Sequence, residues 1–152
     1  MIVKKLLGFG VCKINFPSVP SKERPRYNSR SHTTYTPRST RAREKEIRTE
    51  WLNQVGHKWA TFAGPCEVQI MISRPIPKGA PKRLIGTANL LKPDIDNTAK
   101  LILDALNHYA YKDDKYITCL SVAKAPRIKA GEPASIYIRI DYFQEVEVAN
   151  HK

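Results

Sequence analysis

The sequence predicts one α+β domain, in which a mixed sheet of about four strands packs against two helices. Stretches with an apolar residue at every second position are typical of strands with one buried face, and two stretches with apolar residues three or four positions apart are typical of amphipathic helices. Their order along the chain is β-α-β-α-β-β, which favours an α+β layer arrangement. The 152 residues suffice for one hydrophobic core but not for two.

The chain is expected to start with a strand that ends at Phe16, because residues 11–16 alternate between apolar and polar side chains. Its first residues loosely resemble a signal peptide, but the apolar run is short and Lys13 follows without a small-residue cleavage site. We therefore interpret them as strand and expect a cytoplasmic location. No apolar stretch approaches the roughly 20 residues that span a bilayer, so no membrane association is expected.

The three cysteines, Cys12, Cys66 and Cys119, are widely spaced and flanked by apolar residues. Their odd number and their surroundings indicate core thiols rather than a disulfide framework or a zinc site. Free thiols are typical of a reducing compartment, which agrees with the cytoplasmic location.

A basic segment bounded by prolines, residues 20–38, follows the first strand. Residues 1–60 carry 13 Lys and Arg against 4 Glu, whereas residues 61–152 carry 13 against 10 acidic residues. Basic residues that alternate with Pro, Tyr and Ser suit a loop along a nucleic-acid backbone, where guanidinium and hydroxyl groups donate to phosphates. A merely solvated basic surface is the alternative. The candidate DNA-binding residues are Lys22, Arg24, Arg26, Arg30 and Arg38.

The first helix is expected to begin at a cap formed by Ser39 or Thr40 and to end near Gly56. Apolar residues at helical spacing form one face of it. They are Ile47, Trp51, Leu52 and Val55.

The second half of the chain is expected to hold three strands, a helix and a long loop. The strands cover residues 67–73, 116–123 and 135–143, and the last two are expected to form an antiparallel pair. Residues 74–93, with four prolines, form a long loop of the kind that is usually functional or disordered. The helix covers residues 96–107. Its buried face comprises Ala99, Ile102, Leu103 and Leu106.

The acidic residues concentrate in one part of this basic chain. Five of the fourteen lie within the 21 positions from Asp94 to Asp114, although the net charge is +12. Mg²⁺ takes carboxylate and phosphate oxygens together, so a basic protein with such a cluster is expected to be a metal-dependent nuclease. Asp94 and Asp96 can face the same side as the chain enters the helix. Residues 108–114 are long enough to bring Asp114 back along it.

Structural roles explain part of this pattern. Asp96 is a natural N-cap and Asp113-Asp114 a common turn, although a cap does not require Asp94. Lys100, one turn into the helix, is either a clamp for phosphate or an i,i+4 partner of Asp96. His108 lies close to the motif and is either catalytic or a plain surface histidine.

The spaced elements Asp94-x-Asp96-Asn97-x-x-Lys100, Asp104-Ala105-Leu106 and Asp113-Asp114 resemble those of the RusA-type Holliday-junction resolvases, the crossover junction endodeoxyribonucleases of phages and prophages. The resemblance covers roughly residues 12–142. It implies an endonuclease domain over residues 1–145, followed by a tail over residues 146–152. It also implies a homodimer that binds four-way DNA junctions and makes paired nicks with Mg²⁺ or Mn²⁺ in the bacterial or phage-infected cell.

The same resemblance implies roles for individual residues. Asp94, Asp96 and Asp114 match the metal-binding carboxylates, with Asp113 as a further candidate ligand, and Lys100 matches the essential lysine. The longer loop over residues 74–91 departs from the family pattern. A basic DNA- or RNA-binding protein without catalytic activity is the alternative from a different functional class.

Overall fold

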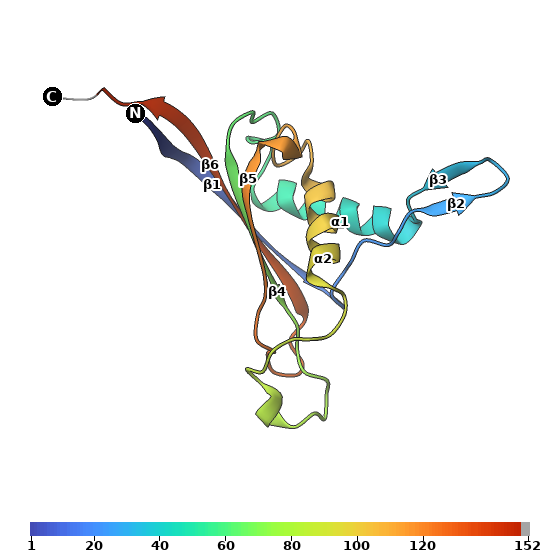
Figure 1. Cartoon of the computed structure of the whole chain (residues 1–152). Helices are drawn as coiled ribbons and strands as arrows, with labels where there is room; N and C mark the ends of the chain where they lie inside the picture. The colour runs from blue at the N-terminus through green and yellow to red at the C-terminus, as the bar shows by residue number, and fades with distance from the viewer. Residues whose placement is uncertain (150–152) are drawn as a thin grey trace.

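The computed structural model describes residues 1–149 and has the expected α+β architecture. The strands are β1 (Ile2–Phe16), β2 (Arg26–Asn28), β3 (Thr33–Tyr35), β4 (Cys66–Ser73), β5 (Ile117–Lys124) and β6 (Ala134–Glu147). The helices are α1 (Arg38–Gln54) and α2 (Ile95–Leu106), with short 3₁₀ helices at Lys82–Leu84 and Asp114–Tyr116. Figure 1 shows both α-helices on one side of the long strands.

The main sheet has four strands in the order β1-β6-β4-β5. β6 pairs antiparallel with β1 and with β4, whereas β4 and β5 are parallel. The expected antiparallel pair of the last two strands is therefore wrong, because β4 lies between β5 and β6. A parallel pair needs a crossover connection, and α2 lies within the one that joins β4 to β5.

The core lies between the helices and one face of the sheet. Alternate residues of β4 and β6 are buried there, and the predicted apolar faces of both helices cover them. Fully buried residues include Ile138 and Ile140 of β6, Trp51 of α1 and Ile102 and Leu106 of α2. Residues of the opposite sheet face, such as Met71 and Tyr137, are exposed. Within residues 1–149, no helix combines the length and the apolar character needed to cross a membrane.

The beginning of α1 differs from the expected cap. Pro37 occupies the N-cap position and no side chain caps the helix. The hydroxyls of Ser39 and Thr40 instead bind Glu23 of the basic segment. Thr40 Oγ1 accepts from the Glu23 backbone N–H at 3.2 Å, and Ser39 Oγ donates to the Glu23 carboxylate at 2.6 Å. The fixed φ of proline suits a helix start without such a cap.

The basic segment is more ordered than the expected loop. β2 and β3 form an antiparallel hairpin that projects from the body of the molecule (Figure 1).

At the other end of the chain, β6 continues to Glu147, which pairs with Ile2, so the strand includes the first two residues of the segment predicted as a tail. Residues 148 and 149 follow the strand, and residues 150–152 lie outside the described residues.

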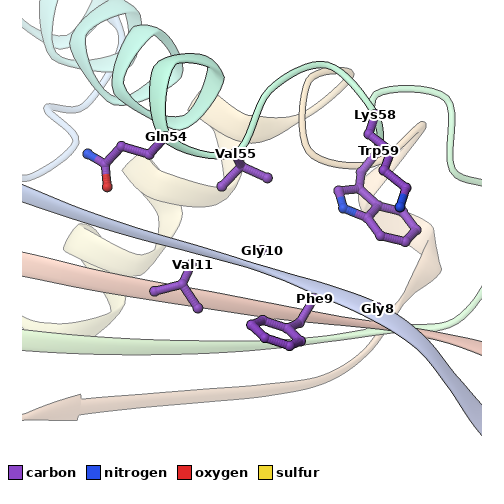
Figure 2. A pocket seen from close by; sticks show the side chains of 8 residues that line it. All are labelled: Gly8, Phe9, Gly10, Val11, Gln54, Val55, Lys58 and Trp59. Carbon is purple, nitrogen blue, oxygen red and sulfur yellow. The ribbon is translucent and has the colours of Figure 1, made fainter.

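A cavity of about 410 Å³ lies between β1 and the end of α1 (Figure 2). Gly8 and Gly10 of β1 border it. A Cβ on Gly8 would come within 2.8 Å of the ring of Trp59, and a Cβ on Gly10 within 2.8 Å of the ring of Trp51. The glycines therefore permit the close approach of two indole rings to the strand. None of the predicted site residues lines this cavity.

Candidate active site

Asp94 occupies the N-cap position directly before α2, in an extended conformation. The expectation that Asp96 caps the helix is wrong, since Asp96 lies inside the first turn. The Asp94 side chain makes no capping hydrogen bond, although its backbone carbonyl accepts from Asn97 and Thr98 at 3.2 and 3.3 Å. Both carboxylates are exposed. They remain available for an external cation.

Two basic side chains hold the segment that leads into α2. Arg74, directly after β4, donates to the carbonyl of Lys92 at 2.5 Å, and Lys124, at the end of β5, donates to the carbonyl of Leu91 at 2.8 Å. Both donors lie at the carboxyl ends of the parallel strands β4 and β5. Asp94 is thereby placed near the carboxyl end of β5.

Lys100 and Asp104 lie on the solvent side of α2, as the i,i+4 spacing predicts. Lys100 is exposed and, in the described part of the chain, forms no ion pair with Asp96. Asp104 instead forms an ion pair with Lys22 of the basic segment. One predicted DNA-binding residue therefore lies against an acidic residue of α2.

Asp113 and Asp114 form an interacting pair directly before β5. The Lys115 N–H donates to Asp113 at 2.9 Å and holds the pKa of that carboxyl below its ordinary value. The pKa of Asp114 is raised, first by loss of hydration and then by its hydrogen bond to Asp113 and the negative charges of Asp113 and Asp104. A cation placed beside Asp114 would relieve this repulsion.

The chain after α2 folds back against the end of the helix. The Tyr111 hydroxyl donates to the carbonyl of Leu103 at 2.9 Å. His108 has a positive φ of 71°, and its Nδ1 lies 2.6 Å from the carbonyl oxygen of Lys112. His108 thus has a structural contact in this turn. The fold-back brings Asp114 close enough to feel the charge of Asp104.

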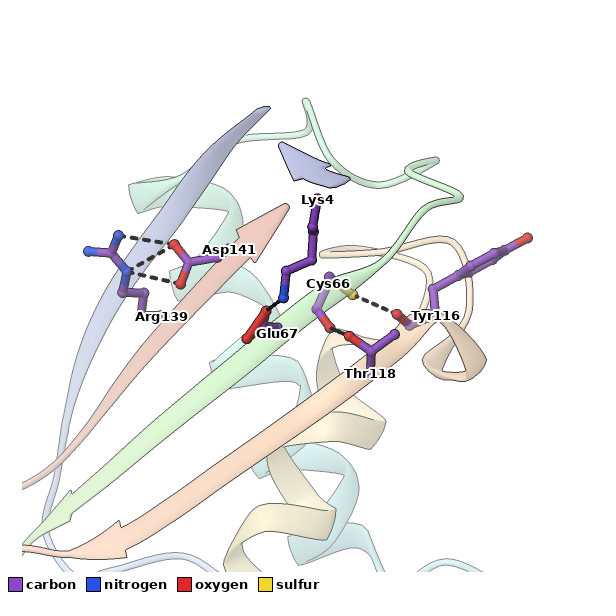
Figure 3. Close-up of polar contacts among 7 residues, drawn as sticks. All are labelled: Lys4, Cys66, Glu67, Tyr116, Thr118, Arg139 and Asp141. Atoms are coloured by element: carbon purple, nitrogen blue, oxygen red, sulfur yellow. Dashed lines mark hydrogen bonds and ion pairs between the residues drawn. The ribbon is translucent and has the colours of Figure 1, made fainter. Parts of the chain in front are cut away.

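Contacts with β4 hold the beginning of β5 in place (Figure 3). Cys66 Sγ donates to the carbonyl of Tyr116 at 3.5 Å, and Thr118 Oγ1 donates to the carbonyl of Cys66 at 3.3 Å. The acidic pair therefore lies at the amino end of β5, whereas Asp94 lies near its carboxyl end.

The predicted metal-binding residues do not come together within the chain. α2 has 12 residues and is about 18 Å long at 1.5 Å per residue, and it separates Asp94 from the turn that carries Asp114. Among residues 1–149, no three His, Cys, Asp or Glu side chains are grouped as metal ligands. Their chemistry nevertheless fits a hard divalent cation, because Asp94 and Asp96 are exposed carboxylates without a capping or ion-pair partner in the described chain.

Glu44 of α1 is a neighbour of this region that the sequence did not single out. Loss of hydration raises its pKa, Lys22 and Arg48 oppose that rise, and Asp104 adds to it. Arg48 also donates to the carbonyl of Ala105 at 3.2 Å. Glu44 and Arg48 are one helical turn apart, so the sequence indicates that both lie on one face of α1. Only the packing shows that this face is turned toward α2.

The basic segment is attached to the first turn of α2. The Lys22 N–H donates to the carbonyl of Asn97 at 3.3 Å, and the Thr98 hydroxyl donates to the carbonyl of Pro20 at 2.9 Å. A cavity of about 230 Å³ lies between the two, and Lys22, Arg24 and Lys100 are among its lining residues. Positive side chains of the basic segment and of α2 thus line one space together with Glu23 and with Asn97, the residue after Asp96.

The other predicted DNA-binding residues lie farther along the segment. Arg26 is in β2 and Arg30 is in the turn between β2 and β3, while Arg38 is the first residue of α1. All three are exposed.

A family model matches most of the chain. The model of the family described as "Endodeoxyribonuclease RusA" matches residues 17–141, which include both helices and the whole acidic region. The chain belongs to the RusA endodeoxyribonuclease family. The region that matches the RusA family leaves out the whole of β1 and the end of β6.

A curated relative is the "Uncharacterized protein YqaN" of Bacillus subtilis (strain 168). It is 39% identical over 71 residues, which cover 41% of this chain and 50% of that protein. The chain thus spans half the length of this curated relative.

Proposed function

We propose that this RusA family member is a Mg²⁺-dependent, structure-selective endodeoxyribonuclease that resolves four-way DNA junctions by paired nicks. The supporting observation is the start of α2, where Asp94 and Asp96 are exposed and uncapped beside Lys100 and the attached basic segment. Negative groups for a metal and positive groups for phosphate thus occur side by side. Membership of the RusA family supports an endonuclease that acts on branched DNA.

Asp94, Asp96 and Asp114 are the proposed metal ligands, with Asp113 as a further oxygen donor. Mg²⁺ at these carboxylates would supply Lewis-acid stabilisation of the phosphate and promote ionisation of the attacking water. Mn²⁺ is expected to substitute for it, because it accepts the same oxygen ligands.

Lys100 and the basic segment act on the DNA itself. The Lys100 ammonium, exposed one turn from Asp96, stabilises the negative charge that develops on the scissile phosphate. Lys22, Arg24, Arg26, Arg30 and Arg38 bind backbone phosphates, which orients the junction without reading its sequence.

We also propose that the protein acts as a homodimer in the cytoplasm of a bacterial or phage-infected cell. Paired nicks require two sites, and two copies supply them symmetrically. The three cysteines are free, which fits a reducing compartment.

A DNA- or RNA-binding protein without catalysis is the second candidate. It is favoured by the absence of a grouped set of three metal-ligating side chains within residues 1–149. In that case the acidic residues would serve the start of α2 and the turn before β5.

The test is cleavage of a synthetic four-way junction by the purified protein. With Mg²⁺ we expect symmetric nicks in the junction, no cleavage of a linear duplex of the same sequence, and no cleavage in EDTA. Asp141→Asn is the matched control for loss of a carboxylate, since Asp141 pairs with Arg139 on the helix-free sheet face. Junction binding without cleavage in Mg²⁺ or Mn²⁺ would favour the second candidate.

A further inference from the structure

The loop after β4 and the connection between β5 and β6 together form a basic lobe, residues 74–92 and 124–133. This lobe carries eight Lys and Arg residues against one acidic residue, Glu132. The rest of residues 61–152 carries five basic residues against nine acidic ones. The positive charge of the second half of the chain is therefore gathered in the lobe.

Backbone hydrogen bonds join the two parts of the lobe. The Ile76 N–H donates to the carbonyl of Ile128 at 2.9 Å, and the Gly86 N–H donates to the carbonyl of Arg127 at 2.8 Å. The Arg127 N–H in turn donates to the carbonyl of Thr87 at 2.8 Å, and its guanidinium donates to the Thr87 hydroxyl. The loop that was expected to be functional or disordered is thus a folded part of the molecule.

Several cations of the lobe have no acidic partner. Four of them are exposed and form no ion pair within residues 1–149: Lys78, Lys82, Arg83 and Lys92. A surface of one sign produces a field that attracts an oppositely charged partner. DNA is the polyanion that fits, because cations that contact its phosphates release condensed counterions and so gain affinity.

The lobe adjoins the proposed metal ligands. Its side chains Arg74 and Lys124 bind the carbonyls of Lys92 and Leu91, directly before Asp94. Figure 1 shows the lobe at the bottom of the molecule and the β2–β3 hairpin at the right, with the beginning of α2 between them. Two basic surfaces thus project in different directions from the region of the carboxylates.

These two directions suit branched DNA. A straight duplex can follow only one of two surfaces that diverge, whereas a junction can place one arm on each. Binding at two linked surfaces is much tighter than binding at one, because the second contact forms within the complex. A protein with two such surfaces therefore prefers a junction to a duplex without reading its sequence.

We propose that the basic lobe is a second DNA-binding surface, which binds the phosphate backbone of one duplex arm while the basic segment, residues 20–38, binds another. The branch point then lies at the start of α2, beside Asp94 and Asp96. The inference deepens the proposed nuclease function and rests on it for the choice of branched DNA as the ligand. Its test needs no cleavage, because binding is measured in EDTA.

Fluorescence anisotropy of a labelled synthetic four-way junction and of a linear duplex provides this test. Lys78→Ala/Lys82→Ala removes two exposed charges of the lobe. We expect the junction Kd to rise about tenfold or more and the slope of log K against log salt to fall by about two. The duplex Kd should change less than about twofold, because a duplex still binds the basic segment.

Lys5→Ala/Lys13→Ala is the matched control, since it removes two exposed charges from β1. It should leave both Kd values unchanged. Lys78→Arg/Lys82→Arg keeps the charges of the lobe and should bind the junction like the wild type. Equal effects of the lobe and β1 pairs, or an equal loss of junction and duplex binding, would overturn the proposal.

Arg83→Gln is an independent single change in the lobe. Thermal unfolding checks that each variant is folded, and Arg83→Gln should lower the salt slope for the junction by about one. An unchanged slope in this folded variant would count against the lobe.

Hydroxyl-radical footprinting locates the contacts on the junction. Lys78→Ala/Lys82→Ala and Arg24→Ala should each lose protection over a different stretch of the arms. Loss over the same stretch, or an unchanged footprint of the lobe variant, would contradict two separate surfaces. A protein that binds junctions through the lobe but cuts no DNA would refute only the nuclease function.

Discussion

Lys100 is the residue whose role most clearly separates catalysis from helix stability. Its side chain is exposed beside the cavity that Lys22 and Arg24 also line, and it forms no ion pair with Asp96 within residues 1–149. The i,i+4 alternative suggested by the sequence is therefore absent from the structure. The position suits an ammonium that faces DNA phosphate.

Lys100→Ala is expected to slow single-turnover junction cleavage about a hundredfold or more, the scale of removing one preorganised electrostatic group. Junction binding and the free energy of unfolding should change little, because the side chain is exposed. Lys100→Arg should rescue only partly, since a planar guanidinium does not replace a compact ammonium. Near-normal single-turnover rates for Lys100→Ala would remove the lysine from the mechanism.

The carboxylates at the start of α2 give a second prediction at this scale. Asp94→Asn and Asp96→Asn should each abolish cleavage while junction binding stays the same or tightens, because a metal ligand and a repulsive charge are lost together. Thermal unfolding should be nearly unchanged, since neither side chain caps α2. Loss of folding in both variants would instead support a purely structural role.

Among the elements, the basic segment joins DNA binding to α2. Its beginning is tied to the first turn of α2 through Lys22 and Thr98, and its hairpin projects into solvent. The hairpin, which is expected to bind DNA, is thus connected to the helix that carries the carboxylates. The segment offers guanidinium groups rather than a base-reading helix.

Arg24→Ala and Arg26→Ala are expected to weaken binding to all junction sequences alike. Each change should lower the slope of log K against log salt by about one, as for a lost phosphate contact. Lys5→Ala, an exposed charge on β1, is the matched control and should change neither quantity. A change of sequence preference at constant affinity would show that these residues read bases.

The packing of β1 against the two indoles gives a prediction about stability. A Cβ at Gly10 would come within 2.8 Å of Trp51 and 2.9 Å of Val55, so Gly10→Ala should lower the free energy of unfolding by about 1–3 kcal/mol. Urea unfolding measures this change. Lys13→Ala, exposed on the same strand, should cost less than about 0.5 kcal/mol. Equal costs for both changes would show that the strand, not the glycine contact, determines the loss.

For the whole molecule, the repeat of apolar residues predicted the helices and the sheet strands with useful accuracy. Periodicity identifies which face of an element is buried, and the buried face of β6 is as expected. In α2 the burial differs in part, because Leu103 is only partly buried and Leu101 is fully buried. It does not identify neighbours, so the position of β4 between β5 and β6 could not be read from the sequence. The short β2–β3 hairpin was missed because its residues are all exposed.

The candidate site was predictable only in part, for a similar reason. The spacing of Asp94, Asp96 and Lys100 is local, and the helix displays all three to solvent. The ion pair of Asp104 with Lys22, and the influence of both charges on the pKa of Glu44, arise from the packing of three separate segments. The separation of Asp94 from Asp114 likewise depends on the parallel placement of β5.

A crystal structure of the protein with Mn²⁺ would show which carboxylates bind the metal, because anomalous scattering locates Mn²⁺. We expect Mn²⁺ bound by Asp94 and Asp96 together with Asp114. Mn²⁺ bound only at Asp104 and Asp113, or no Mn²⁺ at any of these carboxylates, would contradict it.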